Sequence, residues 1–162
     1  MNTLAAGMLI LEPQAVEHAA EMFQVLSDPA IYEFENSPPQ SSAWLEERFK
    51  KLESRASPDG MQHWLNWVIR LPTGALAGYV QATITRDGTA LVAYELASRF
   101  WRQGIGSTAV KAMMGELTAT YGVRNFVAEL KERNYRSAAM LSSMGFQRVG
   151  HRRGDDIVMR KS

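Results

Sequence analysis

A glycine-containing turn that opens a long helical pattern is the feature that most constrains this chain. Residues 102–107 read RQGIGS, follow an apolar run, and lead into apolar residues at helical spacing, namely Ile105, Ala109, Met113 and Leu117. Because glycine lacks a side chain, consecutive backbone N–H groups here can close around phosphate oxygens. The unpaired N–H groups of the first helical turn would point back at the same place. The segment predicts an anion-binding loop, with a plain strand-to-helix turn as the alternative.

Length and composition indicate one soluble domain. A chain of 162 residues with 46% hydrophobic content can bury one core, so we expect a single domain over residues 1–162. The net charge of +1 would not attract nucleic acid or a membrane surface, and no apolar run approaches the roughly 20 residues of a membrane span. The lack of cysteine excludes disulfides and a thiolate nucleophile, and three dispersed histidines suggest no metal site. These features fit a cytoplasmic protein, and the hydrophobic content leaves room for a homodimer.

The first half of the chain predicts a strand, two helices and an antiparallel meander. Apolar periodicity and turn residues indicate a strand at 8–11, a helix at 13–26, an irregular loop at 31–40, and a second helix capped by Ser41 or Ser42 that ends near Ser54. Alternating patterns then indicate three strands at 63–71, 76–85 and 90–98. The turns between these strands are short, and one contains the Asp-Gly pair that tight hairpins favour. Neighbouring strands are therefore antiparallel.

The second half predicts alternating helices and strands. After the helix that follows Gly104 we expect a strand at 124–131, a helix at 134–144 and a closing hairpin at 146–149 and 157–160. The connection through the first of these helices is a parallel crossover. The predicted class is α/β, with a mixed, mostly antiparallel twisted sheet of about six or seven strands flanked by about four helices.

Three landmarks in register carry a family resemblance. They are the run Phe100-Trp101-Arg102-Gln103-Gly104-Ile105-Gly106, the pair Asn134-x-x-Ser137, and the run Met144-Gly145-Phe146. With them the whole chain resembles the GNAT family of N-acetyltransferases, most closely its RimJ/RimL-like branch. The resemblance implies the GNAT fold and an enzyme that transfers an acetyl group from acetyl-CoA to a primary amine by direct attack in a ternary complex. The acceptor would be a small molecule or a peptide.

The resemblance also implies a coenzyme A site. In this family the loop that corresponds to Arg102, Gln103, Gly104, Ile105, Gly106 and Ser107 wraps the diphosphate. Trp101 departs from the family pattern at the first loop position, so Arg102 and Gln103 are expected to act mainly through backbone N–H groups. By the same analogy Leu96 and Ala97 line the thioester, where an amide polarises its carbonyl. Asn134 is expected to contact the cofactor, with simple helix capping as its structural alternative, and Arg136 is expected to meet the cofactor's phosphates.

Two residues are candidates for the chemistry. Glu95 lies inside the apolar run LVAYELA, where burial favours its protonated form and suits a base that deprotonates the attacking ammonium. A strand carboxylate that faces solvent or an arginine is the alternative. Many family members protonate the departing thiolate with a tyrosine seven residues after the asparagine, but that position here is Leu141. Ser137 matches the serine that RimL-type relatives place near the sulfur, although a serine in the first helical turn also simply stabilises a helix start.

The acceptor is the least constrained part of the prediction. Tyr32, Phe34 and Glu35 lie where relatives place the walls of the amine pocket. A catalytically weak acyl-CoA-binding sensor is the alternative function, because the usual tyrosine is missing. A dinucleotide-binding domain is disfavoured, since its glycines open the first strand–helix unit rather than follow a meander.

Overall fold

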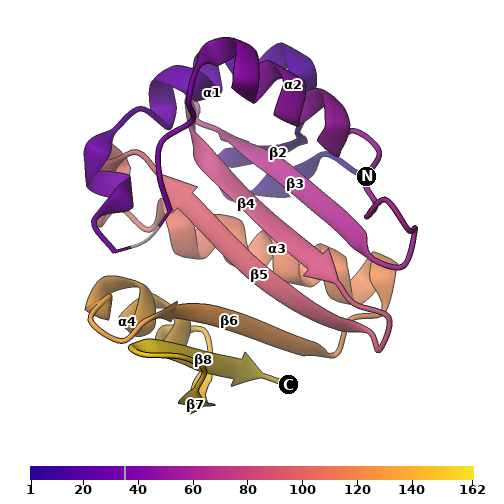
Figure 1. The fold of residues 1–162 in the computed structure, drawn as a ribbon, viewed down its shortest axis with the longest axis vertical. Helices are drawn as coiled ribbons and strands as arrows, with labels where there is room; N and C mark the ends of the chain where they lie inside the picture. The colour runs from indigo at the N-terminus through magenta and orange to yellow at the C-terminus, as the bar shows by residue number, and fades with distance from the viewer. Residues whose placement is uncertain (35) are drawn as a thin grey trace.

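The computed structural model describes residues 1–34 and 36–162 and contains an eight-stranded sheet with helices on both faces (Figure 1). The strands are β1 (Leu4–Ala6), β2 (Leu9–Pro13), β3 (His63–Arg70), β4 (Leu76–Ile84), β5 (Thr89–Leu96), β6 (Asn125–Lys131), β7 (Gln147–His151) and β8 (Asp156–Lys161). The helices are α1 (Ala19–Val25), α2 (Ser42–Leu52), α3 (Ile105–Tyr121) and α4 (Tyr135–Ser143), with 3-10 turns η1 (Val16–His18), η2 (Pro29–Tyr32) and η3 (Ser98–Phe100). Across the sheet the order is β1-β2-β3-β4-β5-β6-β8-β7.

The predicted α/β class is confirmed, with two local corrections. The sheet has eight strands rather than six or seven, because the three residues of β1 form a strand too short to show a period of two. The helix expected from residue 13 begins later, since β2 continues to Pro13 opposite Trp67 and α1 starts at Ala19. Proline has no N–H to donate, so it suits the end of a strand.

Side chains of the expected types cap the helices that frame the site. The Ser41 hydroxyl accepts the Trp44 N–H at 3.0 Å and begins α2. The side-chain oxygen of Asn134 accepts the Ser137 N–H at 3.2 Å and begins α4. Gly122, in the left-handed conformation, ends α3. These local signals place α2 and α4 where the sequence predicts them.

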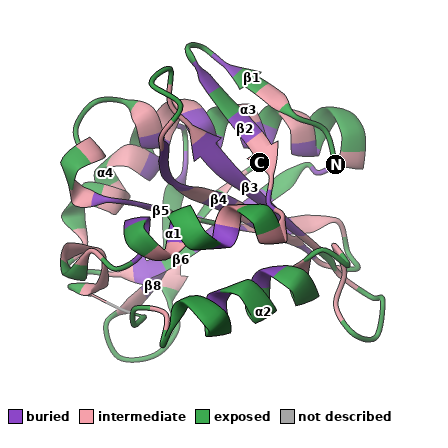
Figure 2. Ribbon diagram, turned by 90° about the horizontal axis from the view of Figure 1, so that it is seen from above, coloured by how far each residue is buried: buried purple, intermediate pink, exposed green. Residues whose placement is uncertain are grey.

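The central strands of the sheet are buried on both faces, whereas β7 at the edge is mostly exposed. One face packs against α3 and α4 through a core that includes Trp67, Val80 and Met113. The other face packs against α1 and α2 through Met22 and Phe49. Figure 2 shows the consequence for α2, whose outward side is exposed and whose buried residues turn toward the strands. Double burial explains why β3 lacks a clean alternation, since its residues 65–69 are all buried.

β5 and β6 part midway along their length, and this positions the site. Their parallel pairing runs from Thr89 opposite Asn125 to Leu91 opposite Val127, whereas the strands continue to Leu96 and Lys131. Figure 1 shows the two strands diverging toward α4. We call the space between their diverging ends the opening. It lies between the part of the sheet that α1 and α2 cover and the part next to α4.

No helix in the described part of the chain combines the length and the apolar character that crossing a membrane requires.

Candidate active site

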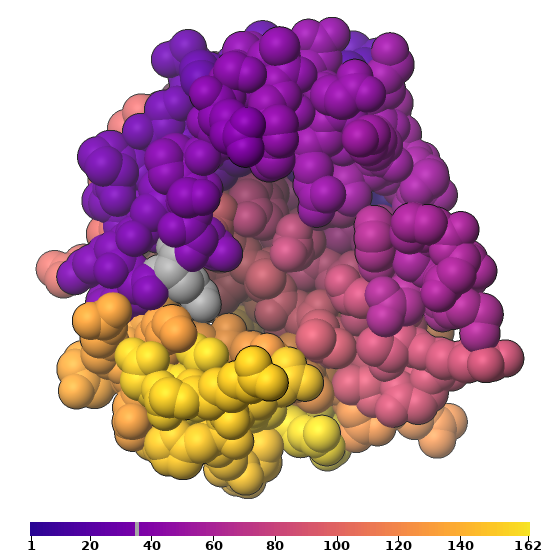
Figure 3. All heavy atoms as spheres, in the orientation of Figure 1, coloured from indigo at the N-terminus to yellow at the C-terminus, as the bar shows by residue number. Residues whose placement is uncertain are grey.

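A cavity of about 600 Å³ occupies the opening. In the space-filling view of Figure 3 it is a hollow between the N-terminal segments above and the C-terminal segments below, with residues of the central strands as its floor. Its walls come from β5, β6, α2, α4, the start of α3 and the segment that follows α1. Segments that are far apart in the sequence therefore meet in this cavity.

The glycine loop lies at one end of the cavity and has backbone N–H groups without a partner among the described residues. Gly104 is in the left-handed conformation with φ of 75° and precedes α3. The first intrahelical bond runs from the Thr108 N–H to the Gly104 carbonyl at 3.0 Å, so the N–H groups of the first helical turn have no partner within the helix. The loop residues that line the cavity are Arg102, Gly104, Ile105, Gly106 and Ser107. The arrangement suits a phosphate group.

The Gln103 side chain and the Ala97 amide are engaged within the protein. The Gln103 side chain donates to the Arg99 carbonyl at 3.0 Å and does not line the cavity, which leaves the backbone N–H of Gln103 as the group expected to contact the cofactor. The Ala97 N–H donates to the Ala77 carbonyl at 3.0 Å, and the residue is 1% exposed in the core beneath α1 and α2. The Ala97 amide is therefore engaged by β4 and does not serve a ligand in the opening.

Leu96 supplies the free amide instead. Hydrogen-bonded and non-hydrogen-bonded pairs alternate along an antiparallel ladder, and Ala97 bonds to Ala77. Leu96, opposite Gly78, must then direct its N–H and carbonyl away from β4 and into the opening. The Trp101 indole N–H donates to that carbonyl at 3.0 Å, which leaves the Leu96 N–H as a donor in the cavity wall.

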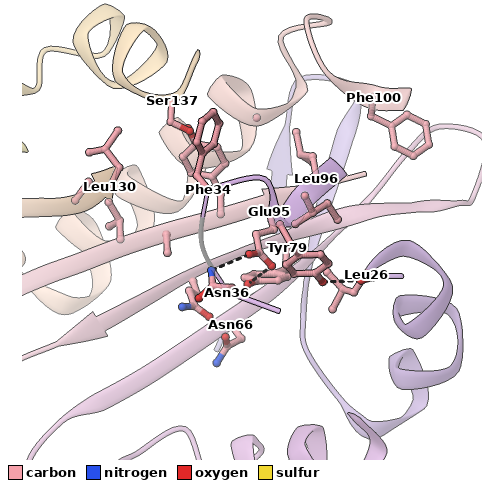
Figure 4. A pocket seen from close by; sticks show the side chains of 18 of the residues that line it. Leu26, Phe34, Asn36, Asn66, Tyr79, Glu95, Leu96, Phe100, Leu130 and Ser137 are labelled. Atoms are coloured by element: carbon pink, nitrogen blue, oxygen red, sulfur yellow. Dashed lines mark hydrogen bonds between the residues drawn. The ribbon is translucent and has the colours of Figure 1, made fainter. Parts of the chain in front are cut away.

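Glu95 faces the cavity from β5 and is held by two hydrogen bonds. The Tyr79 hydroxyl donates to one carboxylate oxygen at 2.7 Å, and the Asn36 side-chain amide donates to the other at 3.2 Å (Figure 4). Burial raises the pKa of the Glu95 carboxyl above its ordinary value, while the two hydrogen bonds oppose the rise. The result is a fixed carboxylate with increased proton affinity at the wall of the cavity.

Two tyrosines beside Glu95 remain neutral hydrogen-bond donors. Burial, followed by the negative charge of Glu95, raises the pKa of Tyr79 well above its ordinary value. Burial together with the charges of Glu95 and Asp28 raises the pKa of Tyr32 to about 12. The Tyr32 hydroxyl donates to the Leu26 carbonyl at 2.5 Å, so this side chain is fixed as part of the wall.

Ser137 faces the opening from α4 and contacts a tyrosine of β5. The Tyr94 hydroxyl donates to Ser137 Oγ at 2.9 Å, and both residues line the cavity. Burial raises the pKa of Tyr94, so its phenol keeps its proton. Leu141, at the position where the family resemblance would lead to a tyrosine, is 2% exposed and also lines the cavity. A tyrosine hydroxyl thus reaches Ser137 from β5 rather than from α4.

The other predicted contacts are distributed around the cavity. Asn134 caps α4 and lines the cavity as well, so its structural alternative and its cofactor role are compatible. The Arg136 guanidinium lies 3.7 Å from the centre of the Trp101 ring. Phe34 lines the cavity with the Arg133 guanidinium 5.7 Å from its ring centre. Glu35, the third predicted acceptor residue, lies outside the described residues.

Sequence reasoning missed three groups of this site. Tyr79 and Asn36 hold Glu95, and Tyr94 holds Ser137. The register of β4 against β5 places Tyr79 opposite Glu95, and a one-residue error would turn Tyr79 to the other face. No motif marks Asn36 or Tyr94, because their partners are distant in the sequence.

Comparisons with known proteins agree with this geometry. Residues 8–147 match the family model of the acetyltransferase (GNAT) domain. A curated relative, the uncharacterized N-acetyltransferase p20 of Bacillus licheniformis, is 22% identical over 152 residues, which are 93% of this chain and 85% of the relative.

Solved structures share the fold over nearly the whole chain. The ribosomal L7/L12 alpha-N-protein acetyltransferase RimL, solved with coenzyme A, is 18% identical with a TM-score of 0.85, covering 99% of this chain and 97% of its own. The ribosomal-protein-S5-alanine acetyltransferase of Vibrio fischeri is 18% identical with a TM-score of 0.84, covering 99% and 96%. The microcin C7 self-immunity acetyltransferase MccE, solved with acetyl-CoA and AMP, is 19% identical with a TM-score of 0.81, covering 96% and 92%.

The family model extends over most of the chain, from the turn before β2 to the start of β7, and includes the loop, the opening and α4. This match supports an enzyme rather than a module that only binds acyl-CoA. The chain therefore belongs to the GNAT family and is an N-acetyltransferase whose acetyl donor is acetyl-CoA.

Proposed function

We propose that this enzyme acetylates a primary amine by direct attack within a ternary complex. Acetyl-CoA supplies an acetyl group activated as a thioester. The observation that carries the proposal is the meeting of three groups in one cavity: the free amides of the glycine loop, the Glu95 carboxylate and the Ser137 hydroxyl. Neighbouring residues of a strand project on opposite faces, so Glu95 and Tyr94, which contacts Ser137, meet the cavity from opposite sides of β5, and an acceptor and a donor can enter the same cavity from different sides.

Residues 102–107 hold the diphosphate in this proposal. Gly104 turns the chain, and the first-turn N–H groups of α3 supply uncharged donors together with the positive end of the helix. A Cβ at Gly106 would lie 3.3 Å from Leu96 Cδ1 and 3.4 Å from Met140 Sδ, so glycine also lets the loop pack close to β5 and α4. The residues present fit the cofactor that the family uses.

Glu95 acts as the general base. An amine at pH 7 is mostly protonated and must lose a proton before it can attack. Glu95 accepts this proton directly or through a water molecule. Tyr79 and Asn36 keep the carboxylate oriented toward the cavity, and burial raises its proton affinity toward that of a useful base.

The Leu96 N–H stabilises the negative charge that develops on the acetyl oxygen. This amide is directed into the opening, and the Trp101 indole fixes the adjacent carbonyl group. A backbone donor that is already oriented costs no reorganisation when the charge forms. Leu96 thereby takes the role that the sequence assigned jointly to Leu96 and Ala97.

Ser137 protonates the departing sulfur. The Tyr94 hydroxyl donates a hydrogen bond to Ser137 Oγ. The hydroxyl hydrogen of Ser137 is therefore free to point at the sulfur. Tyr94 is therefore a positioning residue. Its role compensates for the leucine at position 141, where relatives use a tyrosine directly.

Thermal shift and product analysis test this function. Acetyl-CoA and coenzyme A should raise the melting temperature, and NAD should not, because only specific ligands stabilise the native state by mass action. Thiol release with a panel of amines, followed by mass spectrometry of the acetylated product, should then show turnover. No stabilisation by either coenzyme A species would refute the proposal.

A further inference from the structure

Three amide side chains form a row across the face of the sheet that α2 covers. The Gln14 N–H donates to the Asn66 carbonyl at 2.9 Å, Asn66 lies opposite Gln81, and Gln81 lies opposite Ala93 at the edge of the opening. Side chains of directly opposite residues project on the same face of a sheet. We call Gln14, Asn66 and Gln81 the amide row.

Two members of the amide row are buried and the third is half-buried, yet their polar groups are available. Gln14 is 3% exposed and Asn66 is 6% exposed, whereas Gln81 is half-buried. Among the described residues the three side chains form no hydrogen bond, and all three line the cavity. The one fully enclosed unpaired side-chain nitrogen or oxygen in that part of the chain is Nη1 of Arg55. The amides of the row thus face open cavity, where water or a ligand can supply their hydrogen-bond partners.

The amide row lies at a defined distance from the proposed base. Tyr79, opposite Glu95, is two residues from Gln81 along β4, which corresponds to about 7 Å. An extended peptide covers that distance with about two residues. Figure 4 shows Asn66 below Asn36 and the Tyr79–Glu95 pair, on the side of the pocket away from Ser137. The row is therefore on the acceptor side of the cavity.

Arg48 supplies a positive charge at this end of the cavity. Arg48 of α2 lines the cavity and also a neighbouring hollow of about 310 Å³, which contains Trp64 and Thr83 as well. Its charge is close enough to lower the pKa of the Tyr79 hydroxyl, against the larger effect of burial. In the described residues Arg48 has no ion pair. Asn66 and Gln81 line both spaces, so the hollow continues the cavity past the amide row.

We infer that the amide row and Arg48 form a second acceptor subsite, selective for a peptide amine whose second residue is acidic. The amino group lies at Glu95, and the amides pair with the backbone N–H and carbonyl groups that follow it, since each amide both donates and accepts. Arg48 pairs with the carboxylate of the second side chain. The inference rests on the proposed acetyl transfer and specifies its acceptor.

Three short peptides test the selectivity directly. They share an amino-terminal alanine and differ only at the second residue, which is glutamate, glutamine or lysine. Their binding to the protein saturated with coenzyme A is measured by titration calorimetry, and their acetylation by mass spectrometry. The glutamate peptide should bind about tenfold more tightly than the lysine peptide, as expected for one charge-assisted pair.

Variants assign the selectivity to the subsite. Arg48→Glu should reverse the preference in favour of lysine, whereas Lys51→Glu, an equal charge change on α2 outside the cavity, should leave it unchanged. Asn66→Leu should weaken the binding of all three peptides to the same extent and leave acetyl-CoA binding unchanged. Melting curves establish that each variant folds, and Arg48→Gln, which removes the charge without reversing it, should abolish the preference.

The outcomes separate the subsite from the function. Equal binding of the three peptides, binding of none, or an unchanged preference in Arg48→Glu would overturn the inference. Selective binding without acetylation of these peptides, together with no turnover of the amine panel, would refute the proposed function and leave the subsite standing. Acetylation of all three peptides without selectivity would support the proposed function and refute the subsite.

Discussion

The Tyr94 hydroxyl donates to Ser137 Oγ across 2.9 Å and so joins β5 to α4 at the inner end of the opening. If Ser137 protonates the leaving sulfur, Ser137→Ala should lower kcat roughly 100-fold, the lower range for general acid catalysis. Tyr94→Phe should lower kcat by a smaller factor, about tenfold, because it removes only the orientation of the serine proton. Steady-state kinetics with a saturating acceptor measures both.

The pair of variants also forms a cycle. Since Tyr94 acts only through Ser137, the double variant should lose no more than Ser137→Ala alone. Tyr121→Phe, a matched change on α3 away from the cavity, should be silent. Additive losses, or full turnover in Ser137→Ala, would remove Ser137 from the mechanism.

The acidic limb of the pH–rate profile should report Glu95. The base must be ionised, and burial raises its pKa above its ordinary value, so kcat/KM should fall as the pH drops through that raised pKa. Glu95→Gln should lower kcat by roughly 100-fold and abolish this limb, while acetyl-CoA affinity stays nearly constant. An unaltered profile in the variant would exclude Glu95 as the base.

The same residue predicts a pH-dependent change in stability. A carboxyl whose pKa is raised in the folded state favours folding while protonated and loses this contribution as the pH rises through the folded pKa. Glu95→Gln should therefore melt at a higher temperature than the wild type at pH 7.5, and the difference should vanish below about pH 4.5, the ordinary value for glutamate. Glu46→Gln on the exposed side of α2 serves as the control. A difference that persists at low pH would point to packing rather than ionisation.

Alanine substitutions at two glycines of α3 should have different effects, one on stability and the other on acetyl-CoA binding. Gly115 is exposed in mid-helix with open space around it, so Gly115→Ala should add about 0.5–1 kcal/mol to the free energy of unfolding. Gly106→Ala would press its Cβ against Leu96 and Met140, and should weaken acetyl-CoA binding about tenfold, or about 1.4 kcal/mol. Chemical denaturation and calorimetry measure the two effects. Equal acetyl-CoA affinity in both variants would show that the loop tolerates the extra carbon.

Much of the fold follows from local signals in the sequence. The caps at Ser41 and Asn134, the Asp-Gly turn and the glycine before α3 are each encoded within a few residues, and the elements they delimit were predicted to within a few positions. β1 was missed because three residues carry no period. The helix start near residue 13 was wrong because the apolar spacing there is shared by the end of β2 and by α1.

The site was only half predictable for a physical reason. The loop donors and Glu95 could be located because a motif or an apolar run marks them. Tyr79, Tyr94 and the amide row depend on register between strands and on where β5 leaves β6, which are properties of packing and not of any one segment. Ala97 shows the same limit, since its amide was expected in the opening but is paired with Ala77.

The divergence of β5 from β6 gives the cosubstrate a mechanical role. Beyond Leu91 and Val127 the edge of β5 that faces β6 has backbone groups without a paired strand in the described part of the chain. Proteins usually avoid such an edge by covering it or by closing the sheet. An extended part of the bound cosubstrate in this gap would form hydrogen bonds in place of a strand and so connect the two parts of the sheet. Loading the enzyme should then slow amide hydrogen exchange on both β5 and β6, so that the donor stiffens the protein before it takes part in any reaction.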